Sequence, residues 1–138
     1  MSEPDGFSLD PWLETDSAFV LDLPLSTLRL SGDARYPWLL LVPRKPNLIE
    51  IIDLDAADRT QLMAEIAQVS SALKAITGCD KLNVGALGNM VAQLHVHVIA
   101  RFNDDPAWPG PVWGVGEAQA RSPEARGEMI GALRRALD

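Results

Sequence analysis

Ala92-Gln93-Leu94-His95-Val96-His97-Val98-Ile99 alternates aliphatic side chains with a glutamine and two histidines. A period of two is typical of a β-strand, in which successive side chains point to opposite faces of a sheet. The pattern predicts a strand from Gln93 to Arg101, with Gln93, His95 and His97 on one face. Because imidazole titrates near neutral pH, this face offers a basic or nucleophilic ring nitrogen under physiological conditions.

Two less reactive interpretations compete with this one. A single histidine on a strand is more often a hydrogen-bonded structural residue, but His95 and His97 are the only histidines of the chain and share one face. Two such residues could also chelate a metal ion, yet a structural zinc site needs about four ligands. No suitable cysteine or carboxylate cluster lies nearby in the sequence, so we expect no metal site.

Size and charge narrow the function classes. The 138 residues predict a single domain spanning 1–138, and the 47% hydrophobic and 22% charged fractions are ordinary for a soluble globular protein. The net charge of −7 argues against a nucleic-acid partner, because phosphate contacts need a basic surface. A small phosphorylated ligand needs only a few hydrogen-bond donors at its site, so the negative net charge does not exclude it.

Cysteine content and hydropathy predict the cellular location. The single cysteine, Cys79, excludes an intrachain disulfide and fits a reducing compartment, so we expect a cytoplasmic protein. Residues 1–4 are polar and precede no apolar run typical of a secretory signal. The longest apolar run, Trp38 to Pro43, is too short to cross a bilayer, so no membrane partner is expected.

Hydrophobic periodicity predicts an α+β fold. A long helix should begin after the N-cap Asp55 and end at Gly78, and a C-terminal helix should run from Ser122-Pro123 to about Leu137. The order of three strands, a helix, two strands and a helix favours a mostly antiparallel sheet with helices covering one face. The expected strands are 19–21, 26–30, 38–42, 82–85 and 93–101.

A glycine-flanked loop precedes the histidine strand directly. Gly85 and Gly88 permit backbone conformations in which successive N–H groups cradle an anion. Asn83 and Asn89 would add side-chain amide donors. The alternative is that the two glycines only form a turn between strands, but the histidines immediately downstream favour a phosphate site.

These residues resemble a known family. The segment from Gly88 to Arg101 resembles the core of the histidine triad (HIT) superfamily, in which a Gly-Gln-Ser/Thr-Val loop precedes His-x-His-x-His and apolar residues. Upstream, Trp38-Leu39-Leu40-Leu41-Val42-Pro43-Arg44-Lys45 resembles the family's strand ending in Val-Pro-Lys-Arg-His. The resemblance is closest to the dinucleoside polyphosphate hydrolase-like branch. It covers a core of about 19–101, followed by a substrate-side loop at 102–121 and a C-terminal helix at 122–137.

The resemblance implies a fold and a chemistry. It implies a HIT-like α+β fold with a five-stranded antiparallel sheet, usually assembled as a homodimer. It also implies a nucleotide hydrolase or transferase that cleaves a phosphoanhydride or phosphoramidate of an adenine nucleotide. His95, in the middle position, would form a nucleotidyl-histidine intermediate, and His97 would contact phosphate oxygens. No cofactor would be required beyond a divalent cation accompanying the nucleotide.

Four positions depart from the family pattern. Gln93 replaces the first histidine; its backbone carbonyl can still orient His95, but its side chain cannot relay a proton. Asn89 stands where the family has glutamine, and Met90 where it often has a serine or threonine. Pro46 stands close to where the upstream motif would have a histidine. These departures leave open a catalytically impaired domain that binds or senses nucleotides.

Residues outside the motif complete the predicted site. Trp113, and alternatively Trp108, would stack on a base, unless these rings pack the loop after the strand onto the sheet. Arg44, Lys45 and Arg101 are the basic residues nearest the motifs, and they would neutralise phosphate charge unless they are simply solvated.

Overall fold

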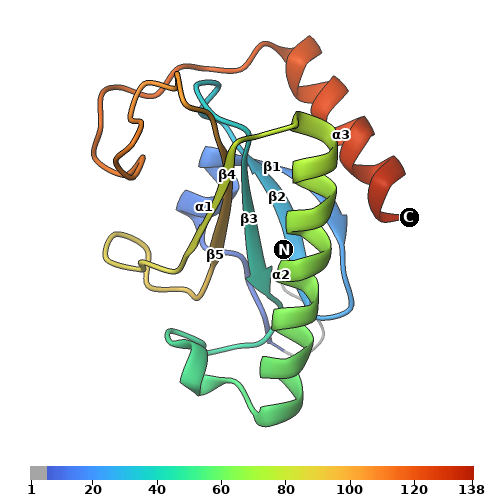
Figure 1. Cartoon of the computed structure of the whole chain (residues 1–138). Helices are drawn as coiled ribbons and strands as arrows, with labels where there is room; N and C mark the ends of the chain where they lie inside the picture. The colour runs from blue at the N-terminus through green and yellow to red at the C-terminus, as the bar shows by residue number, and fades with distance from the viewer. Residues whose placement is uncertain (1–5) are drawn as a thin grey trace.

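A five-stranded antiparallel sheet forms the centre of the fold (Figure 1). The computed structural model describes residues 6–138. Neighbouring strands are antiparallel throughout, which confirms the predicted α+β class. In the spatial order β1-β2-β3-β5-β4, the strands are β1 (Ser17–Asp22), β2 (Ser26–Ser31), β3 (Trp38–Pro43), β5 (Val96–Arg101) and β4 (Lys81–Gly85).

The helices begin and end where their capping residues predict. The long helix α2 (Ala56–Thr77) begins where the Asp55 carboxylate accepts a hydrogen bond from the backbone N–H of Asp58, at 2.8 Å. It ends at Gly78, which has a left-handed φ of 65°. None of the helices in residues 6–138 is long and apolar enough to span a bilayer. The helical segments besides α2 are α1 (Pro11–Asp16), the 3₁₀ turn η1 (Ile51–Asp53) and α3 (Pro123–Leu137).

The two faces of the sheet are covered differently. Leu39 and Leu41 of β3 belong to the large apolar core that includes residues of α2 and α3. Leu40 and Val42, which point to the opposite face, pack instead with Leu13 of α1. Figure 1 shows α2 and α3 beside each other. The prediction that helices cover one face is therefore correct for these two, whereas α1 packs on the other face.

Strand β5 starts later than the alternation predicts. Its ladder with β3 begins at the pair formed by Leu41 and Val96, and β3 itself ends at Pro43. The backbone N–H of Leu94 donates to the carbonyl of Leu48 instead, at 3.0 Å. The predicted strand start at Gln93 is therefore wrong, because the neighbouring strand no longer offers ladder partners there.

Candidate active site at the start of β5

The His95 ring is fixed by the backbone just before it. Its Nδ1 lies 2.6 Å from the carbonyl oxygen of Gln93. A carbonyl can only accept, so Nδ1 carries the proton and Nε2 of the neutral ring keeps its lone pair. His95 is buried at the entrance to β5, where this contact holds the ring in one orientation. The sequence-based expectation that the Gln93 backbone orients this ring agrees with the geometry.

The His97 ring has the opposite tautomer. The indole N–H of Trp38 donates to His97 Nδ1 at 2.9 Å, so Nδ1 is unprotonated and the proton of the neutral ring lies on Nε2. Burial, and secondarily the neighbouring His95, lower the pKa of His97 to about 4. His97 is therefore neutral at physiological pH and presents an N–H donor at Nε2.

The two rings form a complementary pair. Their centroids lie 4.9 Å apart and their planes meet at 65°. His95 has a free electron pair on Nε2, which can act as a nucleophile or a base, and His97 has a donor that can stabilise a negatively charged oxygen. Such a pair suits an attack on a centre that bears anionic oxygens.

His95 lies between two cavities. The larger, of about 580 Å³, is bounded by α1, the turn between β2 and β3, Trp38, both histidines and residues 118–120. The smaller, of about 220 Å³, is bounded by residues 49–52, residues 86–88 and Leu94. Within residues 6–138, no other residue lines both cavities. A bound molecule that reacts at His95 therefore has room for one part on each side of the ring.

Comparison with known proteins identifies the fold and this histidine strand. A family model described as the HIT domain matches residues 13–104, which contain the paired histidines and most of the sheet. The chain belongs to the histidine triad family. None of the curated proteins matches it.

Three solved HIT structures are similar over nearly the whole chain. The histidine triad protein blr8122 from Bradyrhizobium japonicum is 55% identical, with a TM-score of 0.94, covering 96% of this chain and 98% of that one. The HIT protein SMc02904 from Sinorhizobium meliloti 1021 is 44% identical, with a TM-score of 0.93 and coverages of 95% and 97%. A histidine triad protein from Marinobacter aquaeolei VT8 is 37% identical, with a TM-score of 0.92 and coverages of 95% and 96%.

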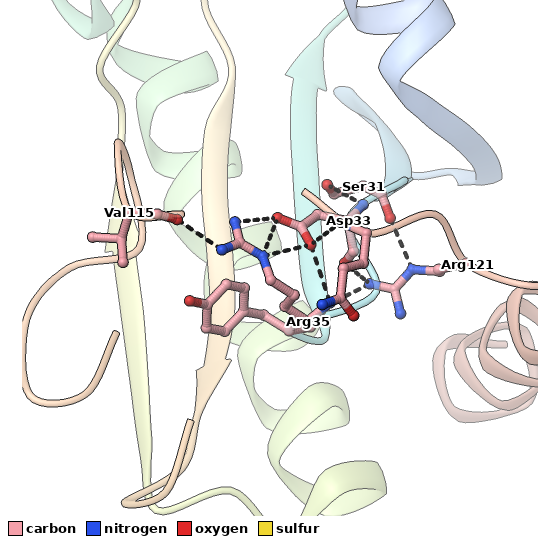
Figure 2. Close-up of polar contacts among 7 residues, drawn as sticks. Ser31, Asp33, Arg35, Val115 and Arg121 are labelled. Carbon is pink, nitrogen blue, oxygen red and sulfur yellow. Dashed lines mark hydrogen bonds and ion pairs between the residues drawn. The ribbon is translucent and has the colours of Figure 1, made fainter. Parts of the chain in front are cut away.

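A polar cluster fixes one wall of the larger cavity of this HIT protein (Figure 2). The buried Asp33 carboxylate accepts from the Arg35 guanidinium, at 2.8 Å, and from the backbone N–H of Gln119, at 3.3 Å. Burial alone would raise the pKa of Asp33, but these hydrogen bonds lower it below its ordinary value. Arg121 donates to the carbonyls of Ser31 and Asp33, both at 2.9 Å. These bonds therefore hold residues 118–120, which form this wall, against the turn between β2 and β3.

The side chain at the first triad position is bound to the N-terminal segment. The Oε1 of Gln93 accepts from the backbone N–H of Asp10 at 2.8 Å, and its Nε2 donates to the carbonyl of Ser8 at 2.9 Å. Leu40, which pairs with His97 in the β3–β5 ladder, packs with Phe7 and Leu13 of the same N-terminal segment. The predicted shared face of Gln93 with the two histidines stays a prediction. The Gln93 side chain holds the N-terminal segment against the site.

The glycine-flanked loop reaches the smaller cavity only in part. Gly88 lines this cavity and has a left-handed φ of 74°, which explains the glycine there. Asn89 and Met90 follow it and are exposed, and neither lines a cavity that touches His95. A phosphate-binding role for Asn89 and Gly88 stays a prediction.

Two other predicted ligand residues have protein partners instead. The Oδ1 of Asn83 accepts from Arg101 at 2.7 Å, and the Arg101 side chain is 1% exposed. Trp113 packs against Gly85 and lies 5.3 Å from His97, centroid to centroid. Neither Asn83 nor Trp113 lines the two cavities beside His95. Trp113 therefore lies beside His97 as a packing residue. Asn83 is bound by Arg101.

Sequence reasoning missed two features of the site. Trp38 was expected only as the start of a buried strand, and its bond to His97 depends on the β3–β5 register, in which Leu40 pairs with His97. The wall formed by residues 49–52 fell between predicted elements, although three isoleucines in four positions, all of them exposed beside the cavity, were a signal. Among the described residues, no group of three or more His, Cys, Asp or Glu side chains could hold a metal ion.

Proposed function

We propose that this HIT protein is a nucleotidyl hydrolase or transferase that cleaves a phosphoanhydride or phosphoramidate of an adenine nucleotide. The observation that carries the proposal is the position of His95. Its Nδ1 is bound by the Gln93 carbonyl, so its Nε2 pair is available, and the ring lies between the two cavities. Membership of the HIT family supports nucleotide binding.

The reaction would proceed in two displacements. Nε2 of His95 attacks the α-phosphorus, an N–P bond forms, and the bond to the leaving group breaks with its electron pair. Water or another acceptor then forms the new P–O bond and the N–P pair returns to Nε2, while the water gives up one proton. A covalent intermediate of this kind replaces one difficult step by two easier ones. His97 would donate its Nε2 hydrogen to a phosphate oxygen and stabilise the charge in both steps.

The larger cavity suits the nucleoside. Leu13, Leu40 and Trp38 give it an apolar and aromatic wall against which a base can pack, and Asp16 places a carboxylate on its rim. Carboxylates accept hydrogen bonds from ribose hydroxyls in other nucleotide sites. They repel phosphates, so the phosphate would lie at the histidine pair and the sugar nearer the rim.

A second function is a nucleotide-binding or sensing domain with little turnover. The observation that favours it is the side chain of Gln93, which bonds to Ser8 and Asp10 and leaves no proton carrier at the first triad position. Under this alternative the cavities still bind the nucleotide, and the histidines only hold its phosphate.

Assembly and cofactor requirement belong to the same proposal. We expect a homodimer, as the family resemblance implies, and turnover without a resident cofactor. A divalent cation would enter only with the nucleotide and neutralise its phosphates. Size-exclusion chromatography with light scattering, and turnover in the presence of a chelator, test these two expectations separately.

The deciding experiment is to trap the nucleotidyl intermediate. Wild-type protein and His95→Ala are mixed with a panel of adenine phosphoanhydrides and phosphoramidates, quenched within the first turnover and analysed by intact mass. We expect one added adenylyl group on wild type and none on His95→Ala. Gln68→Ala, an exposed change on α2, serves as the control and should behave like wild type. Tight binding without adenylylation or AMP release would favour the sensing alternative.

A further inference from the structure

A third cavity, of about 290 Å³, is lined by residues of β1, β2 and the N-terminal segment. Within residues 6–138, it shares no lining residue with the two cavities beside His95. Thr27 and Arg29 line it from alternate positions of β2, so their side chains lie on one face of the sheet. Its volume is just below the range of about 300–1,000 Å³ usual for drug-sized ligands, so it suits a small metabolite.

Arg29 is a buried cation with one end of its guanidinium unused. The residue is 8% exposed. Its Nε donates to the Ser17 hydroxyl at 2.6 Å, and its Nη2 donates to the carbonyls of Ser17 and Glu14, at 2.8 and 3.3 Å. Within the described part of the chain, Nη1 has no acceptor and no carboxylate forms an ion pair with this guanidinium.

The charge of Arg29 is only partly compensated. Burial lowers the pKa of its guanidinium below the ordinary value, and the nearby Glu14 carboxylate offsets this lowering only in part. An anionic group in the cavity would therefore find both an incompletely neutralised positive charge and a free N–H donor.

Two more donors in this cavity lack a full set of partners. The Thr27 hydroxyl, in a residue that is 6% exposed, has no hydrogen bond to any of residues 6–138. Nη1 of Arg44 is buried without a hydrogen-bond partner, although the Asp22 carboxylate lies 3.4 Å away. Arg44 was a candidate phosphate ligand in the sequence, and it lines this cavity rather than those beside His95. A carboxylate, which accepts several hydrogen bonds at once, matches such a group of donors.

The exposed side of the cavity is acidic and aromatic. Glu14 and Asp22 line it, and both residues are exposed. Phe19 is 45% exposed and Phe7 is buried, and both rings also line the cavity. Since the lining contains two guanidinium groups and two carboxylates, it has no net charge. A polyphosphate would be repelled by the exposed carboxylates, whereas an ammonium group would be attracted to them.

We propose that this third cavity binds a free α-amino acid with an apolar side chain. The carboxylate of the amino acid accepts from Nη1 of Arg29 and from the Thr27 hydroxyl. Its ammonium group lies toward the Glu14 carboxylate, and its side chain packs against Phe19. The site does not depend on the proposed function, because it contains neither histidine and can be tested without a nucleotide.

The first test compares three ligands that share a phenyl group and differ in charge. L-Phenylalanine, 3-phenylpropanoate and 2-phenylethylamine are titrated into ¹⁵N-labelled wild-type protein. We expect L-phenylalanine to shift the amide signals of Thr27 and Arg29, with a Kd of about 1 mM or below. The other two each lack one charged group and should bind at least about tenfold more weakly. Equal affinity of either one overturns the inference, as does a failure of L-phenylalanine to bind or to shift these signals.

Variants of the lining test the two ends of the ligand separately. Thr27→Val removes a hydroxyl that has no protein partner and keeps the shape of the side chain, so the fold should be retained. We expect it to weaken L-phenylalanine about tenfold. Glu14→Gln removes the exposed charge and should abolish the advantage of L-phenylalanine over 3-phenylpropanoate. Glu128→Gln makes the same change at an exposed position on α3 and should alter neither affinity. Unchanged affinities in both lining variants would overturn binding in this cavity.

Discussion

The indole N–H of Trp38 donates to Nδ1 of His97 across 2.9 Å, from the strand next to β5. This single bond decides which nitrogen of a neutral imidazole carries the proton. Together with the contact between the Gln93 carbonyl and His95, it gives two adjacent histidines opposite tautomers. One ring thereby presents a lone pair for attack in its neutral form, and the other presents a donor.

Trp38→Phe should lower kcat while the protein stays folded. Phenylalanine keeps the aromatic packing against His97 but removes the donor, so the His97 ring is free to adopt either tautomer. A hydrogen bond of this kind contributes about 0.5–1.5 kcal/mol, so we expect a fall in kcat of up to about tenfold. Long-range ¹H–¹⁵N spectra should find Nδ1 of His97 unprotonated in wild type and partly protonated in the variant. Trp12→Phe, at an exposed position, is the control.

Local chemistry made the helices and most strands predictable. Asp55 and Gly78 cap the two ends of α2. The apolar run that begins at Trp38 ends at Pro43, where β3 also ends. Local patterns failed where a neighbouring segment decides the outcome. The alternation at Gln93 reads as a strand, yet the sheet ends before it because Leu94 pairs with Leu48 instead.

The candidate site was predictable at His95 and only partly elsewhere. Two histidines two positions apart are visible in the sequence, as is the carbonyl that orients the first. The partner of the second was not, because Trp38 meets His97 only in one register of β3 on β5. The wall at residues 118–120 depends on a bond from Gln119 to Asp33, 86 positions apart, which no local pattern encodes.

His97 should make the protein less stable as the pH falls from about 6.5 to 4. Its pKa is about 4 in the folded chain, so within this window the unfolded chain takes up a proton that the folded chain does not. The shift corresponds to about 3 kcal/mol in all. In urea unfolding at several pH values, His97→Gln, which can still accept from Trp38, should lose less stability over this window than wild type. Parallel pH profiles would contradict a buried neutral imidazole.

Gln93→Ala should cost stability rather than turnover. The variant loses the two hydrogen bonds to Ser8 and Asp10, worth about 1–3 kcal/mol together, but it keeps the backbone carbonyl that orients His95. We expect a lower urea midpoint and a kcat close to wild type. Gln93→Glu still accepts from Asp10 and cannot donate to Ser8, so its midpoint should lie between the two. A collapse of kcat with unchanged stability would instead give the side chain a catalytic role.

Asp33→Ala should weaken substrate binding without slowing the chemical step. The carboxylate accepts hydrogen bonds from the backbone of Gln119, which lines the larger cavity, and from the guanidinium of Arg35, as Figure 2 shows for Arg35. Loosening this wall should raise KM for the nucleotide by about tenfold, which corresponds to about 1.4 kcal/mol. Asp22→Ala removes an exposed ion pair outside the two cavities beside His95 and should leave KM unchanged. An equal loss of kcat would show that the wall also positions the reacting phosphate.

Asp105→Ala should destabilise the fold strongly, although Arg101 was a candidate phosphate ligand in the sequence. The two side chains are 1% and 5% exposed and joined at 2.7 Å and 2.9 Å, and the Arg101 hydrogen bonds lower the pKa of Asp105 to about 2. Removing the carboxylate leaves a buried guanidinium half-paired, which costs about 3–5 kcal/mol in urea unfolding. The double variant Arg101→Met/Asp105→Leu removes both charges and should be more stable than Asp105→Ala alone. Because Arg101 lines neither cavity, this double variant should keep its turnover; a loss of turnover in a folded double variant would return Arg101 to the active site.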